Sequence, residues 1–328
     1  MATLTTCGGS AVDNHDHGQA LDAEASKNTP RESLEFGDFT LVALTPPQTS
    51  QYLDFLQLPA PVKPDLQSLD SYISAHLERI SFQGVDTFLG NFEPLTADAV
   101  FSKVVKERRG GNCFELNSLF ARLLLALDYK VRVRCARIRW AVPEDVPPAP
   151  VDHMVLYVNV SDNKGQETPY LVDVGFGGPC PRRALPLHGD AAPYRLRVLD
   201  SDWAKPIEVS ILSQQEHGQR SRWFPLYQVF AYSHEWPDFM DKSWYFATYP
   251  GLVFQEVLAV SRYEGDLWLT LRNRCFTRRR CTSSGIGEVE ERRVVDNIRD
   301  LHSLLDNEFR LKLKPNMDEK LRLKLQLR

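Results

Sequence analysis

The spacing of apolar residues changes along the chain and separates a helical part from a strand-rich part. In the N-terminal part, apolar residues recur three and four positions apart, which is typical of amphipathic helices. The pattern predicts helices over residues 50–58, 66–80 and 96–108, the last with Thr96 as its N-cap. A fourth helix, over 114–129, carries the widest apolar stripe and is expected to be buried. The stripe consists of Phe114, Leu116, Leu119, Phe120, Leu123, Leu124 and Leu127.

Beyond this point apolar and polar residues alternate, as they do in half-buried strands. Two strongly β-prone runs, 153–160 and 169–177, are separated by a short turn-rich stretch and predict a hairpin. An amphipathic helix is expected over 297–309. The other predicted strands are 129–140, 194–199, 207–212, 223–230, 266–279 and 289–295. Helices followed by a β-rich middle and a smaller mixed part predict an α+β protein.

Size and composition describe an ordinary folded protein. With 328 residues, 43% hydrophobic and 25% charged, the chain is long enough for two or three packed layers. The net charge of −4 gives no reason to expect a nucleic-acid or membrane partner, and no apolar run approaches the length of a bilayer span. The six cysteines are too sparse for a disulfide framework and lack C-x-x-C spacing. We therefore expect reduced thiols, no metal site and a cytoplasmic protein.

We expect both ends of the chain to lack regular structure. Residues 1–36 are small and polar, without the apolar region of a secretory signal, and are predicted to be disordered. His15-Asp16-His17 has the residue types of a metal site, but such a triplet in a polar tail is more often simply solvated. Residues 320–328 alternate Leu with basic residues. An added edge strand or a membrane-surface contact would fit this alternation, and a frayed tail is the preferred interpretation.

The segment R-R-G-G-N-C, from Arg108 to Cys113, ends where the helix predicted over 114–129 begins. A thiol at a helix start lies near the positive end of the helix dipole and near unpaired N–H groups, and both favour the reactive thiolate. The two glycines allow a tight turn and leave room for a substrate at the sulfur. Nearby N–H groups are suited to stabilise an oxyanion. Cys113 is therefore the candidate nucleophile, and the later cysteines are interpreted as small buried hydrophobes.

His153 begins one strand of the predicted hairpin, and Asp173 lies on the other. Together with Cys113 they match a thiol triad, in which the imidazole accepts the thiol proton and the carboxylate orients the imidazole. The chain order Cys, His, Asp excludes caspase-like enzymes, whose His precedes the Cys. Each residue alone has an ordinary structural explanation. Together they favour the triad, because the alternative requires three coincidences.

Three segments resemble the arylamine N-acetyltransferase family. RRGGNCFELN is similar to the family's R-G-G-x-C-x-E/Q-x-N segment around the catalytic cysteine, DHMVLYV to its histidine strand and YLVDVGFGG to its aspartate strand. Weaker similarity extends from Gln51 to Lys314. The long loop between His153 and Asp173 resembles eukaryotic members and suggests a fungal branch.

The resemblance implies a papain- or transglutaminase-like cysteine enzyme built from three parts. A helical domain over 37–128 would carry the nucleophile, and a β-barrel-like domain over 129–240 would carry the His and the Asp. An α/β lid with a C-terminal tail would follow over 241–328. The implied catalytic residues are Cys113 as nucleophile, His153 as base and Asp173 as orienting acid.

The resemblance also implies contacts with substrates. Phe176 of the G-F-G sequence, Phe114 and Phe82 would line the acceptor pocket, although core packing explains Phe114 and Phe82 equally well. Phe82 matches the aromatic residue of the family's P-F-E-N-L segment, which is altered here to S-F-Q-G-V. After Pro250, where relatives often carry small hydroxyl residues facing coenzyme A, this chain has G-L-V, which makes Gly251 the candidate coenzyme A contact.

A basic cluster near the C-terminus could also hold the coenzyme A phosphates, because guanidinium groups match phosphate geometry. A solvated strand and loop is the preferred interpretation. The cluster consists of Arg272, Arg274, Arg278, Arg279 and Arg280.

The implied reaction is a ping-pong acyl transfer through Cys113. Acyl-coenzyme A, as acetyl-CoA or malonyl-CoA, would acylate the thiol, and an arylamine or arylhydrazine would then accept the acyl group, as in xenobiotic metabolism. No metal and no permanently bound cofactor are required, and we expect a monomer or a weak oligomer. Two alternatives stay open: a papain- or transglutaminase-like cysteine hydrolase, and a catalytically inactive binding protein on the same fold.

Overall fold

The computed structural model covers most of the chain beyond its N-terminal segment. The predicted tail 1–36, with His15-Asp16-His17, lies outside the described residues. The described residues are 40–59, 63–142, 146, 149–162, 164–200, 205–213, 221–232 and 234–328.

The helices predicted from the three-to-four spacing are confirmed. Thr96 caps its helix as expected, with its side chain accepting from the Ala99 N–H. This helix continues into a π-helical turn at Ser102–Lys106. Among the described residues the helices are α1 (Pro46–Leu56), α2 (Leu66–Arg79), α3 (Val85–Phe88), α4 (Ala97–Phe101), α5 (Cys113–Ala126), α6 (Asp238–Thr248), α7 (Val253–Glu256), α8 (Ile298–Asn307) and α9 (Asp318–Leu325), with a 3-10 turn at Pro315–Met317.

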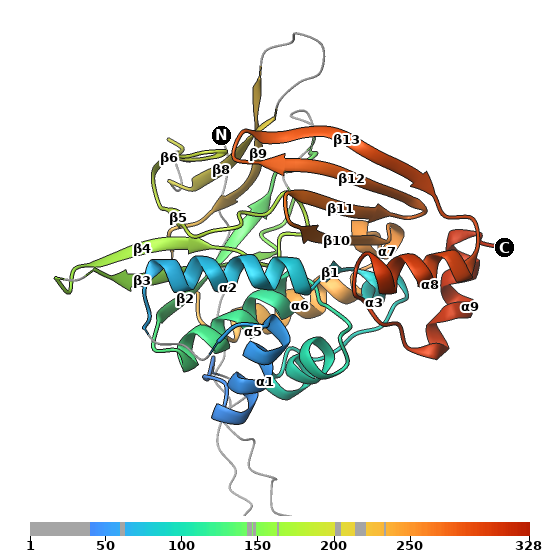
Figure 1. Ribbon diagram of the computed structural model, residues 1–328, viewed down its shortest axis with the longest axis horizontal. Coiled ribbons are helices and arrows are strands. Elements are labelled where there is room, and N and C mark those ends of the chain that lie inside the picture. Colours follow the sequence, from blue (N-terminus) through green and yellow to red (C-terminus); the bar gives the residue numbers. More distant parts are fainter. Residues whose placement is uncertain are drawn as a thin grey trace, which may run out of the picture. The chain divides into compact units, whose positions relative to one another are not determined.

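The strands of the described residues join into one 13-stranded sheet in the order β1-β10-β11-β12-β13-β8-β9-β2-β3-β4-β5, with β7 beside β8 and β6 beside β7 (Figure 1). Neighbours are antiparallel except β13 and β8. The predicted hairpin is confirmed as β3 and β4. The strands are β1 (Phe82–Gln83), β2 (Lys130–Ile138), β3 (His153–Ser161), β4 (Glu167–Val172), β5 (Leu185–Pro186), β6 (Gly189–Ala191), β7 (Tyr194–Val198), β8 (Ile207–Ser213), β9 (Arg222–Val229), β10 (Ala259–Glu264), β11 (Leu267–Arg272), β12 (Cys275–Thr282) and β13 (Gly285–Val294).

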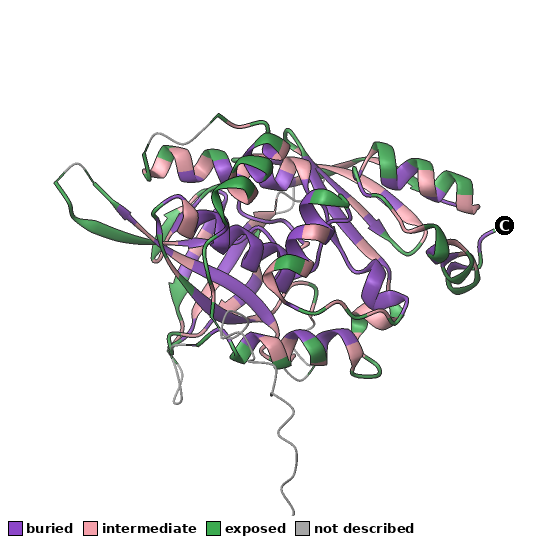
Figure 2. Cartoon of the chain, turned by 90° about the horizontal axis from the view of Figure 1, so that it is seen from below, coloured by how far each residue is buried: buried purple, intermediate pink, exposed green. Residues whose placement is uncertain are grey.

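Two hydrophobic cores hold these elements together. The larger one joins α1, α2 and α5 to β2, β3 and β4, and the smaller one joins α3, α8 and α9 to β10, β11 and β12. Figure 2 shows buried residues concentrated in the centre, with exposed residues on the outer faces of the helices. The helix α5 is buried over most of its length, as its apolar stripe predicted. No helix of the described residues is long and apolar enough to span a bilayer.

The two-residue strand β1 connects the helical part to the far edge of the sheet. Phe82 pairs with Ser261 of β10 on one side and forms a parallel bridge with Gly111 on the other. The Ser81 hydroxyl donates to the carbonyl of Phe309, which follows α8. The segment that precedes Cys113 is therefore attached to the C-terminal part of the chain.

Two sequence predictions were wrong in detail, and one 11-residue helix was missed. Residues 320–328 are neither a frayed tail nor a strand: most of them belong to α9, because Leu321 and Leu325 lie four positions apart on one buried helix face. The helix α6 was not predicted at all. Asp173 does not lie on a strand, because β4 ends at Val172.

Candidate active site

The candidate nucleophile Cys113 is the first residue of α5. Asn112 is the N-cap and accepts hydrogen bonds from the N–H groups of Phe114 and Glu115, while the Glu115 carboxylate accepts from the Asn112 N–H at 2.8 Å. This reciprocal arrangement is a capping box. The first-turn amide that the cap does not use is that of Cys113 itself.

The turn before Cys113 requires glycine. Gly110 has a left-handed φ of 58°, and a Cβ at this position would lie 2.3 Å from the Ser81 carbonyl oxygen. The N–H of Gly111 donates to the same carbonyl at 3.2 Å. The paired glycines therefore let the backbone pass close to β1, which places the start of α5.

The three predicted catalytic residues are brought together in a buried position. His153 is the first residue of β3, and its Nε2 lies 2.8 Å from Oδ2 of Asp173. The Cys113 thiol lies 3.8 Å from the carbonyl oxygen of Asp152, directly before His153. Cys113, His153 and Asp173 are 5%, 2% and 1% exposed. Because Nε2 faces Asp173, Nδ1 is the ring nitrogen left for the thiol.

Asn117 holds the aspartate in place. Its Nδ2 donates to Oδ1 of Asp173 at 2.9 Å and to the Met154 carbonyl at 2.7 Å, while its Oδ1 accepts from the Val174 N–H at 3.0 Å. The Gly175 N–H also donates to Asp173 Oδ1 at 2.9 Å. Asn117 is one turn beyond Cys113 on α5, so a single helix positions both the thiol and the carboxylate.

Gly175 allows the aspartate loop to approach the nucleophile helix closely. A Cβ at Gly175 would lie 2.8 Å from Asn117 Nδ2, 2.9 Å from the Cys113 Cα and 3.0 Å from the Cys113 carbonyl oxygen. Such distances leave no room for any side chain. The D-V-G sequence therefore keeps the loop after β4 close to α5 at the site.

The charge state of His153 follows from its neighbours. Burial alone would lower the pKa of His153, but the Asp173 carboxylate and the interaction with Cys113 outweigh burial and raise it to about 10. His153 is therefore an imidazolium at neutral pH, which is the state that stabilises a thiolate on Cys113.

Phe176 lies at this site, together with a residue that the sequence did not single out. The ring of Phe176 is 5.7 Å from that of His153 and 5.1 Å from that of Tyr227, and the Tyr227 ring is 5.2 Å from His153, all between centroids. Tyr227 comes from β9. Burial and the Asp173 carboxylate raise the pKa of its hydroxyl well above the ordinary value. The alternating pattern predicted the strand that carries Tyr227, but it gave no sign that the Tyr227 side chain reaches the imidazole of His153.

Phe114 and Phe82 belong to a second aromatic group. Phe114 is fully buried and packs on Phe246 at 5.8 Å, and Phe82 packs on Phe254 at 5.7 Å. Phe246 and Phe254 are 5.1 Å apart, so the four rings form a continuous row that joins α5 and β1 to α6 and α7. Both predicted phenylalanines therefore pack between the helical part and the C-terminal part of the chain.

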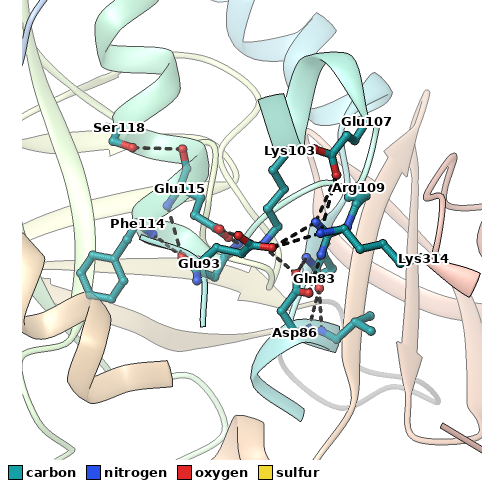
Figure 3. Close-up of polar contacts among 12 residues, drawn as sticks. Gln83, Asp86, Glu93, Lys103, Glu107, Arg109, Phe114, Glu115, Ser118 and Lys314 are labelled. Carbon is teal, nitrogen blue, oxygen red and sulfur yellow. Dashed lines mark hydrogen bonds and ion pairs between the residues drawn. The ribbon is translucent and has the colours of Figure 1, made fainter. Parts of the chain in front are cut away.

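A buried ion network lies next to the start of α5 and is shown in Figure 3. Lys103 is 2.7 Å from both Asp86 and Glu115, and Arg109 is 2.5 Å from Asp86. The side chains of these four residues are at most 9% exposed. Two buried cations and two buried carboxylates therefore pair with one another near the start of α5, and Arg109 also pairs with the more exposed Glu93 and Glu107.

The altered P-F-E-N-L segment contributes to this network. The family pattern has a Glu where this chain has Gln83, whose amide donates to Asp86 at 2.9 Å and whose carbonyl accepts from the Val85 N–H at 2.6 Å. Asp86, the residue directly after the altered segment, supplies a carboxylate that pairs with Arg109.

The sequence offered two candidate contacts for coenzyme A, Gly251 and the basic cluster, and they lie in different surroundings. Gly251 has a left-handed φ of 83° in the turn before α7 and has no heavy atom within 4 Å of a Cβ built there. The arginines of the basic cluster largely face acids of neighbouring elements: Arg278 pairs with Glu291 and Glu308 at 2.7 Å each. Arg274 pairs with Asp296 and Arg280 with Glu290. These ion pairs account for much of the cluster without a phosphate ligand.

Comparison with known proteins agrees with this geometry. A family model described as N-acetyltransferase matches residues 65–318. The arylamine N-acetyltransferase of Mycolicibacterium smegmatis is 33% identical over 230 residues, which cover 68% of this chain and 79% of that relative. The chain belongs to the arylamine N-acetyltransferase family.

Other members of the arylamine N-acetyltransferase family agree in sequence and fold. The Salmonella typhimurium arylamine N-acetyltransferase / N-hydroxyarylamine O-acetyltransferase is 30% identical over 255 residues, covering 76% of this chain and 83% of that relative. The Mycobacterium marinum arylamine N-acetyltransferase in complex with CoA has a TM-score of 0.71 and 28% identity, covering 83% of this chain and 98% of that one. The predicted family and its papain-like fold are confirmed. The fungal branch stays a prediction.

Proposed function

We propose that this protein is an acyl-coenzyme A-dependent arylamine N-acyltransferase, with acetyl-CoA as the first donor to test and malonyl-CoA as the second. The observation that carries the proposal is the buried arrangement of Cys113, His153 and Asp173 on the fold of this family. The acceptors would be arylamines or arylhydrazines. We also propose a cytoplasmic enzyme that acts as a monomer or weak oligomer.

In the first half-reaction, the Cys113 thiolate attacks the carbonyl carbon of the acyl thioester. The bond between that carbon and the coenzyme A sulfur breaks, and the leaving thiolate takes the proton of the His153 imidazolium. In the second half-reaction, the amine nitrogen attacks the acyl group on Cys113. Its proton passes to His153, and Cys113 leaves as a thiolate, which restores the starting state.

The surroundings of the triad support these steps. Asp173 and Asn117 hold the imidazole in one orientation, so Nδ1 handles the proton in both half-reactions. The Cys113 N–H, which the helix cap leaves free for a ligand, would donate to the oxyanion of the tetrahedral intermediate. Phe176 and Tyr227 lie beside the imidazole and would face an aromatic acceptor.

In this proposal each part of the chain has its own role at the site. Residues 37–128 would supply the nucleophile, 129–240 the His and the Asp, and 241–328 a lid over the substrates. Phe82 and Phe114 would shape the acceptor side through their ring row, and Gly251 would contact coenzyme A in its exposed turn.

The test is a mass measurement followed by an acceptor chase. Incubation with acetyl-CoA or malonyl-CoA is expected to add one acyl group to Cys113, seen by intact mass and peptide mapping, and p-anisidine should then remove it as the N-acyl product. Cys113→Ser should carry no adduct. An unmodified thiol with both donors would contradict the proposal. Cleavage of peptides without acyl transfer would favour the hydrolase alternative, and neither activity would favour the inactive binding protein.

A further inference from the structure

Lys103 is a buried cation held between two carboxylates. Its Nζ lies 2.7 Å from Asp86 Oδ2 and 2.7 Å from Glu115 Oε1, and its side chain is 5% exposed (Figure 3). Burial alone would lower the pKa of Lys103, but the carboxylates of Glu115 and Asp86 outweigh burial and raise it, so the ammonium stays charged. The residue comes from the π-helical turn Ser102–Lys106. Nothing in the proposed chemical steps uses it.

Glu115 links this cation to the nucleophile. One of its oxygens accepts a hydrogen bond from the Lys103 ammonium. The other accepts one from the N–H of Asn112, the residue directly before Cys113. The side chain of Glu115 is 3% exposed, so its charge is poorly screened by water. A carboxylate in this place would oppose a negative charge on the sulfur if no cation neutralised it.

Other titratable groups lie near the thiol, and one of them, Asp152, has a buried oxygen without a hydrogen-bond partner. His153, at the start of β3, faces Asp173 beyond β4, and Asp152 precedes His153 with its pKa raised by burial. Cys135 of β2 is a further titratable group within electrostatic reach, and burial raises its pKa to about 12. Among the described residues, Lys103 is the one ion-pair partner of Glu115, whereas Asp86 also pairs with Arg109.

We propose that Lys103 is a positioning residue for Cys113: by neutralising Glu115, it lets one carboxylate cap the nucleophile helix without opposing the thiolate. Asp86 shares Lys103 with Glu115 and also pairs with Arg109. Removal of both Lys103 and the Glu115 charge therefore leaves Asp86 with Arg109, which also pairs with the partly exposed Glu93 and Glu107. The inference rests on the proposed role of Cys113 as the acyl carrier.

The test measures the reactivity of the Cys113 thiol. In the full chain at pH 7, the rate of Cys113 alkylation by iodoacetamide is followed by mass mapping of the Cys113 peptide. Lys103→Met is expected to slow alkylation about tenfold or more, since a buried carboxylate is left without its cation. Adding Glu115→Gln should restore the rate to within about threefold of wild type, because the Gln carbonyl can still accept the Asn112 N–H without a charge.

The recovery of the alkylation rate in the double variant shows whether Lys103 acts through its charge or only through packing. If Lys103 acted only by packing, removing a second polar contact would not recover the rate, and a double variant as slow as Lys103→Met would overturn the inference. Unchanged alkylation in Lys103→Met would overturn it as well. Should Lys103→Met fail to fold, the charge-balanced double variant carries the test alone: alkylation near the wild-type rate supports the inference, and slow alkylation overturns it.

Two comparisons complete the design. Lys130→Met removes an ion pair with Glu167 from a side chain that is 73% exposed, and it should leave alkylation unchanged. Acylation by acetyl-CoA is measured in parallel on the same proteins. A wild-type thiol that is alkylated rapidly but never acylated would contradict the proposed function while leaving the role of Lys103 to be decided by the alkylation rates.

Discussion

The amide of Asn117 donates to the carboxylate of Asp173 at 2.9 Å, and both side chains are almost completely buried. This contact ties the nucleophile helix to the loop after β4. It leaves the other oxygen of Asp173 to the imidazole of His153. The orientation of the proposed base is therefore set by a residue on the same helix as the thiol.

Replacing Asn117 by Ala is expected to slow acylation of Cys113 by about tenfold or more. The change frees Asp173 from one donor and leaves the Met154 carbonyl and the Val174 N–H without their partner, at a stability cost on the order of 1–3 kcal/mol. Single-turnover acylation and urea unfolding measure the two effects. Asn307→Ala, which removes an exposed amide bonded to Ser303, is the matched control. Wild-type acylation in Asn117→Ala would contradict the assigned role.

A methyl group at Gly175 should disrupt the site. The added Cβ would lie within 3.0 Å of backbone atoms of Cys113, so the loop after β4 and α5 must separate. We expect about a tenfold or larger loss of acylation with about 1–3 kcal/mol of destabilisation. Gly287→Ala is the control, because a Cβ there meets the Arg280 carbonyl at an ordinary 3.5 Å. Equal activity of the two variants would argue against a close approach at Gly175.

The stability of the protein should fall in mild acid because of His76. Burial lowers the pKa of His76 to about 3, while the unfolded chain has the ordinary value of about 6.5. Between these values the unfolded state binds a proton that the folded state does not, so the free energy of unfolding decreases as the pH falls. The contribution lost at pH 5 is about 2 kcal/mol.

Urea unfolding at pH 7 and pH 5 checks this prediction against His76→Asn. The Asn oxygen can accept the Tyr52 hydroxyl, which lies 2.6 Å from His76 Nδ1, but it does not titrate. The variant should lose about 2 kcal/mol less than wild type between the two pH values. An identical loss in both proteins would show that another group controls the acid sensitivity.

The helix α9 should contribute to the stability of the protein through its buried face. Leu321 is fully buried in the smaller core, so Leu321→Ala should cost about 2–5 kcal/mol in the free energy of unfolding. Leu323, two residues away and 61% exposed, should tolerate the same change with little effect. Similar values for both would mean that this segment is not anchored as a helix.

Sequence patterns predicted most elements because their periods were clear. Residues 66–80 and 153–160 each show one period over many positions, and the structure has α2 and β3 there. The alternation in 320–328 was misleading, because every second Leu also places Leu321 and Leu325 four apart, which suits a helix. Local period alone could not decide between the two, since the deciding contacts come from the smaller core.

The candidate site was partly visible in the sequence. The triad could be named because its residue types and chain order are specific to a chemistry. Tyr227 and Lys103 could not be identified in this way, because nothing in the neighbouring sequence distinguishes them from any other Tyr on a strand or Lys on a helix. The position of Tyr227 depends on β9 pairing with β2, the neighbour of β3, and that of Lys103 on a turn of π-helix. Both are properties of the assembled fold.

The attachment of β1 to the C-terminal part has a consequence for synthesis on the ribosome. Ser81 and Phe309, which are joined by a hydrogen bond, are 228 positions apart. At typical elongation rates, the second emerges roughly 10–45 s after the first. During that interval Ser81, next to the residue that bridges to Gly111, lacks its hydrogen bond to the Phe309 carbonyl. A nascent chain therefore exposes its cysteine well before that cysteine acquires its reactive geometry, and ribosome-bound chains should be poorer acyl acceptors than released protein.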